Sequence, residues 1–402
     1  MWEKLRRFRP KHCDLPTTMD NLSVLLRVLA LNPDGRDEGI PIAATVLTVL
    51  GIGVYVYVYV FSMVWSVFLR ENEDLAGNMI MFSVGMATGM SMVKLFCVHI
   101  KSALVTKTVA AYLSCDKRVS RESRMYSNRL RYMRTIKRRA TFVWLMTVTN
   151  GIAYCIRPFF QRGKHLILDA QTLYGLDPNF ESPNFELTFV LVVMAVVVVV
   201  YSCATITSLL IIFVGYVEAQ MLALGDEMLH LWDDAQALTT EETDPATQKK
   251  LQNQHIEHQL KSIVQTHAAS LNLLHLTESV FSTSIAIEFC LLALDIISAM
   301  LGDLESTYLE IPYALNQVII DCLIGQRLVE ASLRFRETVY ACKWEEFDAS
   351  NMKTVLMILK NTKTMVLSAG GIAELQLTTL MYVLKSIYTT YAALRTTMNK
   401  NT

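Results

Sequence analysis

Small and hydroxyl-bearing side chains recur at helical spacing near the C-terminus, and such a surface could line a path for ions in water. The residues are Ser386, Thr389, Thr390, Ala393, Thr396 and Thr397. Hydroxyls and small side chains can line water without holding an ion tightly. Small residues also let two helices approach closely, so a helix contact explains the same surface equally well. The residues alone therefore leave a pore wall and a packing face as open alternatives.

Two acidic residues, Glu288 and Asp295, lie in another apolar stretch and share one helix face because they are seven residues apart. Ionisable groups within a membrane usually pair inside the helix bundle or mark a path for ions. Pairing with other buried groups is the default interpretation. Attraction of cations along a water-filled path is the alternative.

The sequence carries no pattern typical of an enzyme or a metal site. It contains no Gly-rich phosphate loop, no HExxH helix and no nucleophile elbow. The eight cysteines do not have the spacing of a zinc site. The formal net charge is zero, which gives no indication of nucleic acid binding. We therefore predict a non-enzymatic protein without a metal, a cofactor or a nucleic acid partner.

The elements that must position these residues are membrane-spanning helices. The chain is 52% hydrophobic and only 18% charged, with a mean hydropathy of +0.32. Residues 41–69 and 187–217 contain no charged side chain, and each exceeds the roughly 20 residues that span a bilayer as a helix. Residues 54–60 alternate Val and Tyr, which is also the period of a strand. A lone strand would leave unpaired backbone groups in lipid, so we expect a helix.

Five weaker spans complete an all-α bundle of seven transmembrane helices. They cover residues 75–98, 140–160, 277–301, 308–328 and 365–398. The connections on one side carry 28 Lys and Arg residues and those on the other side carry three. The positive-inside rule then places the N-terminus in the cytoplasm and the C-terminus outside, opposite to a G-protein-coupled receptor. All cysteines fall in spans or cytoplasmic segments, so we expect free thiols.

The fourth and fifth spans are expected to continue into the cytoplasm as two amphipathic helices, 213–233 and 248–276, joined by a polar turn at 239–247. We expect the segments 1–40 (cytoplasmic), 41–217 (spans one to four with an outer ligand pocket), 218–276 (cytoplasmic extension), 277–332 (spans five and six), 333–372 (cytoplasmic anchor) and 373–402 (final span and extracellular tail). A cytoplasmic helical extension such as 218–276 is typical of contact between subunits.

The C-terminal region resembles the signature of insect odorant receptors. The matching features are Tyr340, Trp344 with Phe347 and Asn351, the small-residue turn at Gly370 and Gly371, and the late Tyr388 and Leu394-Arg395. The sequence departs from the family at Thr364, where a Pro is common, and at Leu380, near which a Phe is common. These departures concern the local turn between the signature and the final span.

The resemblance implies a ligand-gated, non-selective cation channel in the plasma membrane of an olfactory sensory neuron. Such channels are heterotetramers of a variable odorant-binding subunit and a shared co-receptor, and they pass Na⁺, K⁺ and Ca²⁺. The chain lacks the larger insert that the co-receptor carries between its fourth and fifth spans, so it resembles the odorant-binding subunit. A taste receptor of the same superfamily is the nearest alternative. A transporter is a further one, although its inverted repeats are not visible in the two halves.

The resemblance also implies roles for individual residues. The subunit anchor would include Tyr340, Trp344, Phe347 and Asn351. The pore wall would be formed by Ser386, Thr389, Thr390, Ala393, Leu394 and Thr397, with Ala393, Leu394 and Thr397 as candidates for the constriction.

A small volatile odorant needs a closed apolar cavity with one or two polar groups, and we expect it in the outer halves of the second to fifth spans. The candidates, taken at helical spacing, are Met79, Phe82, Met86, Thr147, Asn150, Gly151, Tyr154, Phe189, Val193 and Met194. Met adapts to varied shapes and aromatic rings supply dispersion contacts. Asn150 or Tyr154 could form a hydrogen bond to the ligand. Ordinary packing between helices, or against membrane lipid, remains the alternative at each position.

Overall fold

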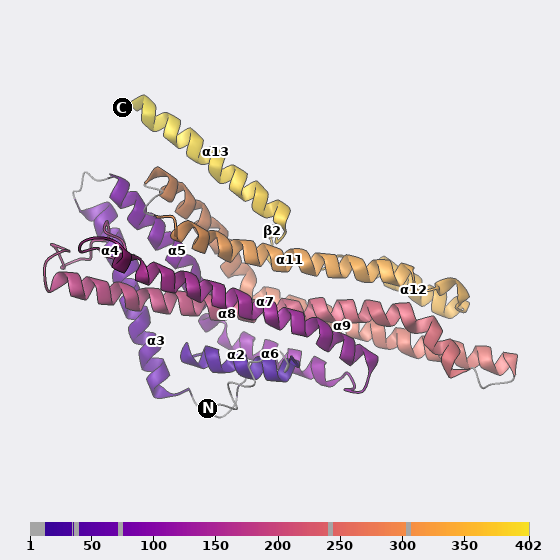
Figure 1. Cartoon of the computed structure of the whole chain (residues 1–402). Coiled ribbons are helices and arrows are strands. Elements are labelled where there is room, and N and C mark those ends of the chain that lie inside the picture. Colours follow the sequence, from indigo (N-terminus) through magenta and orange to yellow (C-terminus); the bar gives the residue numbers. More distant parts are fainter. Residues whose placement is uncertain are drawn as a thin grey trace.

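The chain forms an elongated helical bundle from which the last helix projects (Figure 1). The computed structural model describes residues 13–33, 35, 40–70, 75–239, 244–302 and 307–401. Its helices are α2 (Leu15–Val28), α3 (Ile42–Tyr55), η1 (Val56–Phe61), α4 (Ser62–Val64), η2 (Trp65–Leu69), α5 (Leu75–Ile100), α6 (Ser102–Lys117), α7 (Arg124–Ile156), η3 (Arg157–Phe160), α8 (Asn184–Leu238), α9 (Pro245–Leu301), α11 (Glu310–Tyr340), η4 (Trp344–Glu346), α12 (Ala349–Asn361) and α13 (Leu377–Asn401). The basic residues expected before position 13, Arg36 and the middle of the polar turn lie outside the described residues.

The first span is helical throughout, as the cost of unpaired backbone groups in lipid predicts. The helix continues from α3 through η1, α4 and η2, and the alternating Val and Tyr residues form the π-helical turns of η1. At its end, the Arg70 backbone N–H donates to the Trp65 carbonyl at 2.9 Å. The alternation of Val and Tyr therefore produces no strand here.

Four of the described helices are long and apolar enough to cross a membrane by themselves. They are the continuous helix Ile42–Leu69, α5, α8 and α9. Helices α7, α11 and α13 supply the remaining spans and carry more polar side chains, because much of their surface faces other helices or water. As expected, α8 and α9 extend well beyond the apolar region, to Leu238 and from Pro245.

The final span begins later than its hydropathy indicates. Residues 365–376, which the apolar composition assigned to that span, contain a small hairpin instead. Strand β1 (Ser368–Ala369) pairs antiparallel with β2 (Ala373–Glu374), and α13 starts at Leu377. Gly370 and Gly371 form the turn, and both have positive φ values, of 62° and 72°, which glycine adopts without steric cost.

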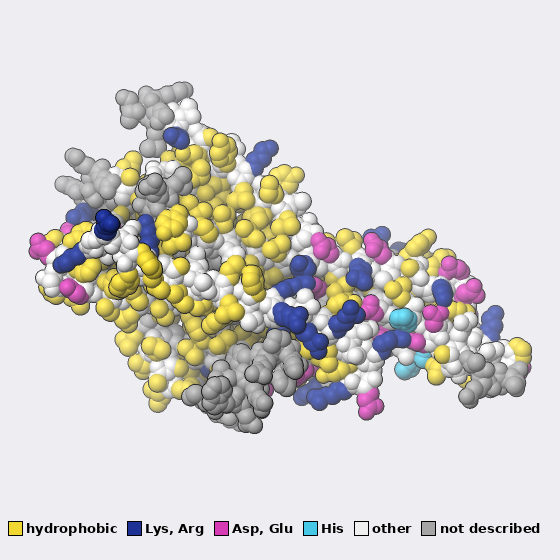
Figure 2. Space-filling model, in the orientation of Figure 1, with side chains coloured by type: hydrophobic (Ala, Val, Ile, Leu, Met, Phe, Trp, Pro, Cys, Tyr) yellow, Lys and Arg dark blue, Asp and Glu magenta, His cyan; other side chains and the backbone are white. Residues whose placement is uncertain are grey.

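The surface separates into an apolar band and a charged end. In Figure 2, hydrophobic side chains cover the part of the molecule built by α3, α5, α7 and the beginning of α8. Acidic, basic and His side chains gather over the far ends of α8, α9 and α12. Large exposed apolar side chains such as Phe142, Ile152 and Val197 are those that a lipid environment would cover. This division agrees with a membrane part and a cytoplasmic part.

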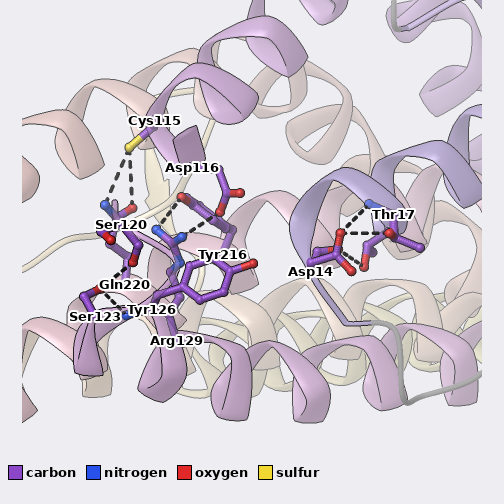
Figure 3. A network of polar contacts seen from close by, with 11 residues as sticks. Asp14, Thr17, Cys115, Asp116, Ser120, Ser123, Tyr126, Arg129, Tyr216 and Gln220 are labelled. Atoms are coloured by element: carbon purple, nitrogen blue, oxygen red, sulfur yellow. Dashed lines mark hydrogen bonds and ion pairs between the residues drawn. The ribbon is translucent and has the colours of Figure 1, made fainter. Parts of the chain in front are cut away.

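A buried polar network joins α6, α7 and α8 at the cytoplasmic side (Figure 3). Arg129 forms an ion pair of 2.7 Å with Asp116 and donates to the Tyr216 hydroxyl at 3.0 Å. Beside this pair, the Gln220 amide donates to the Cys115 sulfur at 3.6 Å. Burial raises the pKa of the Asp116 carboxyl above its ordinary value, against the opposing effect of the Arg129 charge. The network therefore fixes the three helices where they leave the membrane.

All eight cysteines are free thiols, as we expected from their positions in spans or cytoplasmic segments.

Candidate ligand site and channel elements

A cavity lies where α5, α7, α8 and α11 meet η1 of the first span, in the outer half of the bundle. Its lining is Tyr59, Val84, Ala87, Thr88, Asn150, Gly151, Tyr154, Val196, Val199, Val200, Leu309, Glu310 and Tyr313. Its volume is about 40 Å³, whereas one water occupies roughly 10–15 Å³ by a comparable measure. The cavity in this conformation therefore has room for only a few heavy atoms.

The cavity is mostly apolar but contains a small set of polar groups. The Tyr59 side chain is only 2% exposed, and its hydroxyl has no hydrogen-bond partner among the described residues. The Asn150 side-chain amide donates to the Leu309 carbonyl at 3.4 Å. A few polar groups in an apolar cavity are typical of sites for small organic ligands.

One wall of the cavity continues into a pair of buried acids. The carboxyl of Glu310 lines the cavity and that of Asp295 lies behind it. The Ser83 hydroxyl lies 2.8 Å from Asp295 Oδ1 and 2.8 Å from Glu310 Oε1. The ion pairs found among the described residues include none to either acid.

A second buried group lies one level closer to the cytoplasm. The Lys94 ammonium contacts the Glu288 carboxylate at 2.8 Å and the Asp321 carboxylate at 3.1 Å. All three side chains are at most 1% exposed. Between the two groups, the hydroxyls of Ser91 and Tyr313 lie 2.7 Å apart. Glu288 and Asp295 thus pair within the bundle, which was the default of the two interpretations.

The predicted ligand residues fall into two sets. Asn150, Gly151 and Tyr154 on α7 line the cavity. The lining does not include Met79, Phe82, Met86, Thr147, Phe189, Val193 and Met194. On α5 the cavity is lined instead by Val84, Ala87 and Thr88, and Phe82 packs edge-on against Phe68 of the first span. Phe189 likewise packs edge-on against Phe159.

Helical spacing identifies a face but not the direction in which it points. Sequence reasoning missed Tyr59, Glu310 and Tyr313 as site residues. Their only signal was the presence of polar side chains inside apolar spans. Such residues are expected to face the interior of a bundle, and for Glu310 and the two tyrosines the structure shows this interior to be the cavity wall.

The predicted pore residues share an uncovered face of α13. Ser386, Thr389, Thr390, Ala393, Leu394 and Thr397 are all exposed, whereas the buried side chains of α13, Leu380 and Ile387, lie in its first half, and the helix projects from the bundle (Figure 1). The hydroxyls of Thr389 and Thr390 donate to carbonyls of their own helix at 2.9 Å. Each bonded hydroxyl keeps oxygen lone pairs that can face water.

The hairpin before α13 is attached to α9. The Ser368 hydroxyl donates to the Glu278 carboxylate, and the Ser282 hydroxyl donates to the Ser368 carbonyl at 2.7 Å. The Gly370 backbone N–H also donates to the Ser282 carbonyl, at 3.0 Å. The same segment is also joined to α11, since the Met365 backbone N–H donates to the Ser332 hydroxyl at 3.2 Å. Motion of α9 or α11 would therefore reach α13 through these attachments.

The signature residues of the predicted anchor lie at the cytoplasmic end. Phe347 is buried and its ring lies 6.1 Å from that of Trp232 on α8. The Asn351 side-chain amide donates to the Asn253 carbonyl on α9 at 3.0 Å. Trp344 is half-buried and Tyr340 is exposed. Within one chain, the signature thus ties α12 to the extensions of α8 and α9.

Comparisons with known proteins agree with this architecture. Residues 71–388 match the family model described as 7tm Odorant receptor. The solved structure of the insect olfactory receptor OR5 from Machilis hrabei superposes with a TM-score of 0.75 at 14% identity, covering 94% of this chain and 98% of that one. The structure of the same receptor in complex with eugenol gives a TM-score of 0.71 at 14% identity, covering 95% and 98%.

No curated protein sequence matches the chain significantly. The match to the family model nevertheless extends over most of the sequence and includes the cavity lining apart from Tyr59, the hairpin and the first part of α13. The chain therefore belongs to the odorant receptor family, whose members are multi-pass membrane proteins that act as ligand-gated ion channels rather than enzymes.

Proposed function

We propose that this chain is the odorant-binding subunit of a non-selective cation channel that assembles with a co-receptor as a heterotetramer. The observation that carries this proposal is the outer cavity, because it combines an apolar wall with a Tyr59 hydroxyl that has no partner among the described residues. The connection between α8, which ends at Leu238, and α9, which begins at Pro245, is short. A short connection favours the odorant-binding subunit over the co-receptor, whose insert at this place is longer.

The size of the cavity gives a mechanism for gating. A ligand with more than a few heavy atoms requires α5, α7, α8 and α11 to separate from their present positions around the cavity. Such a ligand binds the expanded conformation better and shifts the equilibrium toward it. Because α11 and α9 hold the hairpin, their displacement would move α13 and widen the pore. Cations such as Na⁺, K⁺ and Ca²⁺ would then cross down their gradients.

The first expected result is an odorant-evoked cation current that requires a co-receptor. Cells expressing the chain together with an insect co-receptor should respond to some members of a panel of volatile compounds. Cells expressing the chain alone should reach a much smaller current. The measurement is whole-cell current with simultaneous labelling of the chain at the cell surface. Equal currents with and without the co-receptor would contradict the heteromeric assembly, and no current with any volatile would contradict the receptor function.

A second expected result concerns α13. Replacing Ala393 by Lys should place a positive charge on the proposed pore face and reduce cation current, with Ca²⁺ affected more than Na⁺ because repulsion grows with ionic charge. The variant Ala393→Gln adds a side chain of similar length without the charge and is the control. Relative permeability is obtained from the reversal potential under a Ca²⁺ gradient. An identical reversal potential for the two variants would argue against this face as the ion path.

A further inference from the structure

The buried pair of Glu310 and Asp295 indicates the chemical class of the ligand. The Ser83 hydroxyl lies 2.8 Å from an oxygen of each acid. A hydroxyl has one hydrogen, so it can donate to only one of them. The other carboxyl at this distance must donate to the hydroxyl oxygen and therefore carries a proton. The pair thus holds at least one proton, and loss of a second proton would leave it with one negative charge.

Among the described residues, no ion pair joins a cation to either acid that could balance such a charge. Lys94, which is also buried in the bundle, is bound to Glu288 and Asp321. Asp295 also has one oxygen, Oδ2, that is buried and unpartnered among the described residues. Burying a charge without a partner is costly. A positively charged group placed beside Glu310 would remove that cost.

The cavity next to the acids has the remaining features of a site for a cation. The Tyr59 hydroxyl is buried, faces the cavity and has no partner among the described residues, so its oxygen can accept a hydrogen bond. Tyr154 and Tyr313 also line the cavity. Tyrosine rings attract ammonium groups through their π-electrons, most strongly where water is excluded. The two acids therefore lie beside a cavity that offers a second hydrogen-bond acceptor, the Tyr59 hydroxyl oxygen.

From this arrangement we infer that the cavity recognises a small volatile amine in its ammonium form. The ammonium N–H groups would donate to Glu310 and to the Tyr59 hydroxyl oxygen. The alkyl part would lie against Val84, Val196 and Val199. This inference rests on the proposed function and adds to it a class of ligand. An alcohol of the same shape would fit the apolar wall but could not balance the charge of the acid pair.

The test compares two probes of nearly the same shape, 3-methylbutylamine and 3-methylbutanol, on the chain co-expressed with a co-receptor. An alkylamine is an ammonium ion at neutral pH, as the similar side chain of lysine is. We expect the amine to evoke current at lower concentration than the alcohol. Glu310→Gln should raise the half-maximal concentration of the amine by about ten- to a hundredfold, the loss expected for one charge-assisted hydrogen bond, and should change the half-maximal concentration of the alcohol much less.

Two further variants make the result specific. Asp295→Asn removes the second acid of the pair and should also weaken the response to the amine. Glu186→Gln makes the same chemical change on the exposed first turn of α8, away from the cavity, and should leave both responses unchanged. The comparison of the two probes on the unaltered chain needs no variant, so it decides the inference even where a variant does not reach the cell surface.

The experiment distinguishes failure of the amine assignment from failure of the proposed receptor function. A current evoked by neutral volatiles, with the amine no more potent than the alcohol, would overturn the assignment to amines and leave the receptor function intact. An unchanged amine response in Glu310→Gln would overturn it as well. Absence of current with amines and with every neutral volatile would overturn the proposed receptor function, and the ligand class with it.

Discussion

Replacing Lys94 by Met should prevent the chain from reaching the cell surface as a folded receptor. Lys94 lies between Glu288 and Asp321, and all three side chains are buried. Removing the cation leaves two carboxyl groups without a partner in the interior. Breaking a buried ion pair in this way costs roughly 3–5 kcal/mol, a large part of the roughly 5–15 kcal/mol that stabilises a folded domain. The measurement is surface labelling together with the thermal unfolding of the purified receptor in detergent.

Two controls separate the loss of pairing from a general effect of the substitution. Lys261→Met also breaks an ion pair, that of 2.7 Å with Glu257, but both side chains are exposed, and such pairs contribute only about 0–1 kcal/mol. It should behave like the unaltered chain. The triple variant Lys94→Met, Glu288→Gln, Asp321→Asn removes all three charges together and should recover part of the stability, since no unpaired charge remains. Normal surface levels and unfolding temperature in Lys94→Met alone would show that the pairing contributes little.

Much of the fold follows from the sequence because lipid imposes few choices on the backbone. Apolar length identified the strongest spans, and the requirement for internal hydrogen bonds decided between helix and strand at residues 54–60. The start of α13 was placed too early because apolar composition does not distinguish a span from a hairpin packed on α9. The two glycines at positions 370 and 371 marked that turn, and their positive φ values are the physical reason for it.

The cavity could be predicted only in part, because it depends on how the helices are rotated against one another. That rotation is set by close contacts such as the one between Gly151 and Val200, where a larger residue would collide. Spacing correctly grouped Asn150, Gly151 and Tyr154 on one face of α7, and the structure turns this face toward the cavity. On α5 the equally regular row of Met79, Phe82 and Met86 lies outside the lining. Nothing in the local sequence distinguishes the two rows.

Glu310 illustrates the same point for a charged residue. Its position at the start of an amphipathic span indicated a residue that faces other helices or water. Its partner Ser83 comes from α5, which is distant in sequence, and its partner Asp295 comes from α9, which precedes it in the chain. The pairing of Ser83 with two acids, and the position of that pair beside the Tyr59 hydroxyl, arise only when α5, α9 and α11 are packed against the first span. Polar residues within spans are therefore better starting points for finding a site than rows of apolar residues.

The second large effect is expected at Gly325, where α11 meets the hairpin. A Cβ atom at this position would overlap the Leu375 backbone carbonyl and crowd the Leu375 side chain. Leu375 closes the hairpin, because its backbone N–H donates to the Leu367 carbonyl at 2.9 Å. Gly325→Ala should therefore push the hairpin, and α13 with it, away from α11. We expect normal surface expression with a large change in ligand-evoked current, because the added methyl group acts on this attachment and not on the cavity.

The size of the effect follows from the cost of overpacking, which is about 1–3 kcal/mol for an added methyl group in a well-packed place. If that cost falls on only one of the two channel states, the equilibrium between them changes by about 5- to 150-fold. Gly53→Ala is the matched control, since no other described part of the chain, apart from its own stretch of helix, lies within 4 Å of the Cβ position there. Current per surface receptor and the current without ligand are the two readouts. If both match the control, the hairpin does not transmit motion from α11 to α13, and the link must run through the direct contacts of α13 with α9.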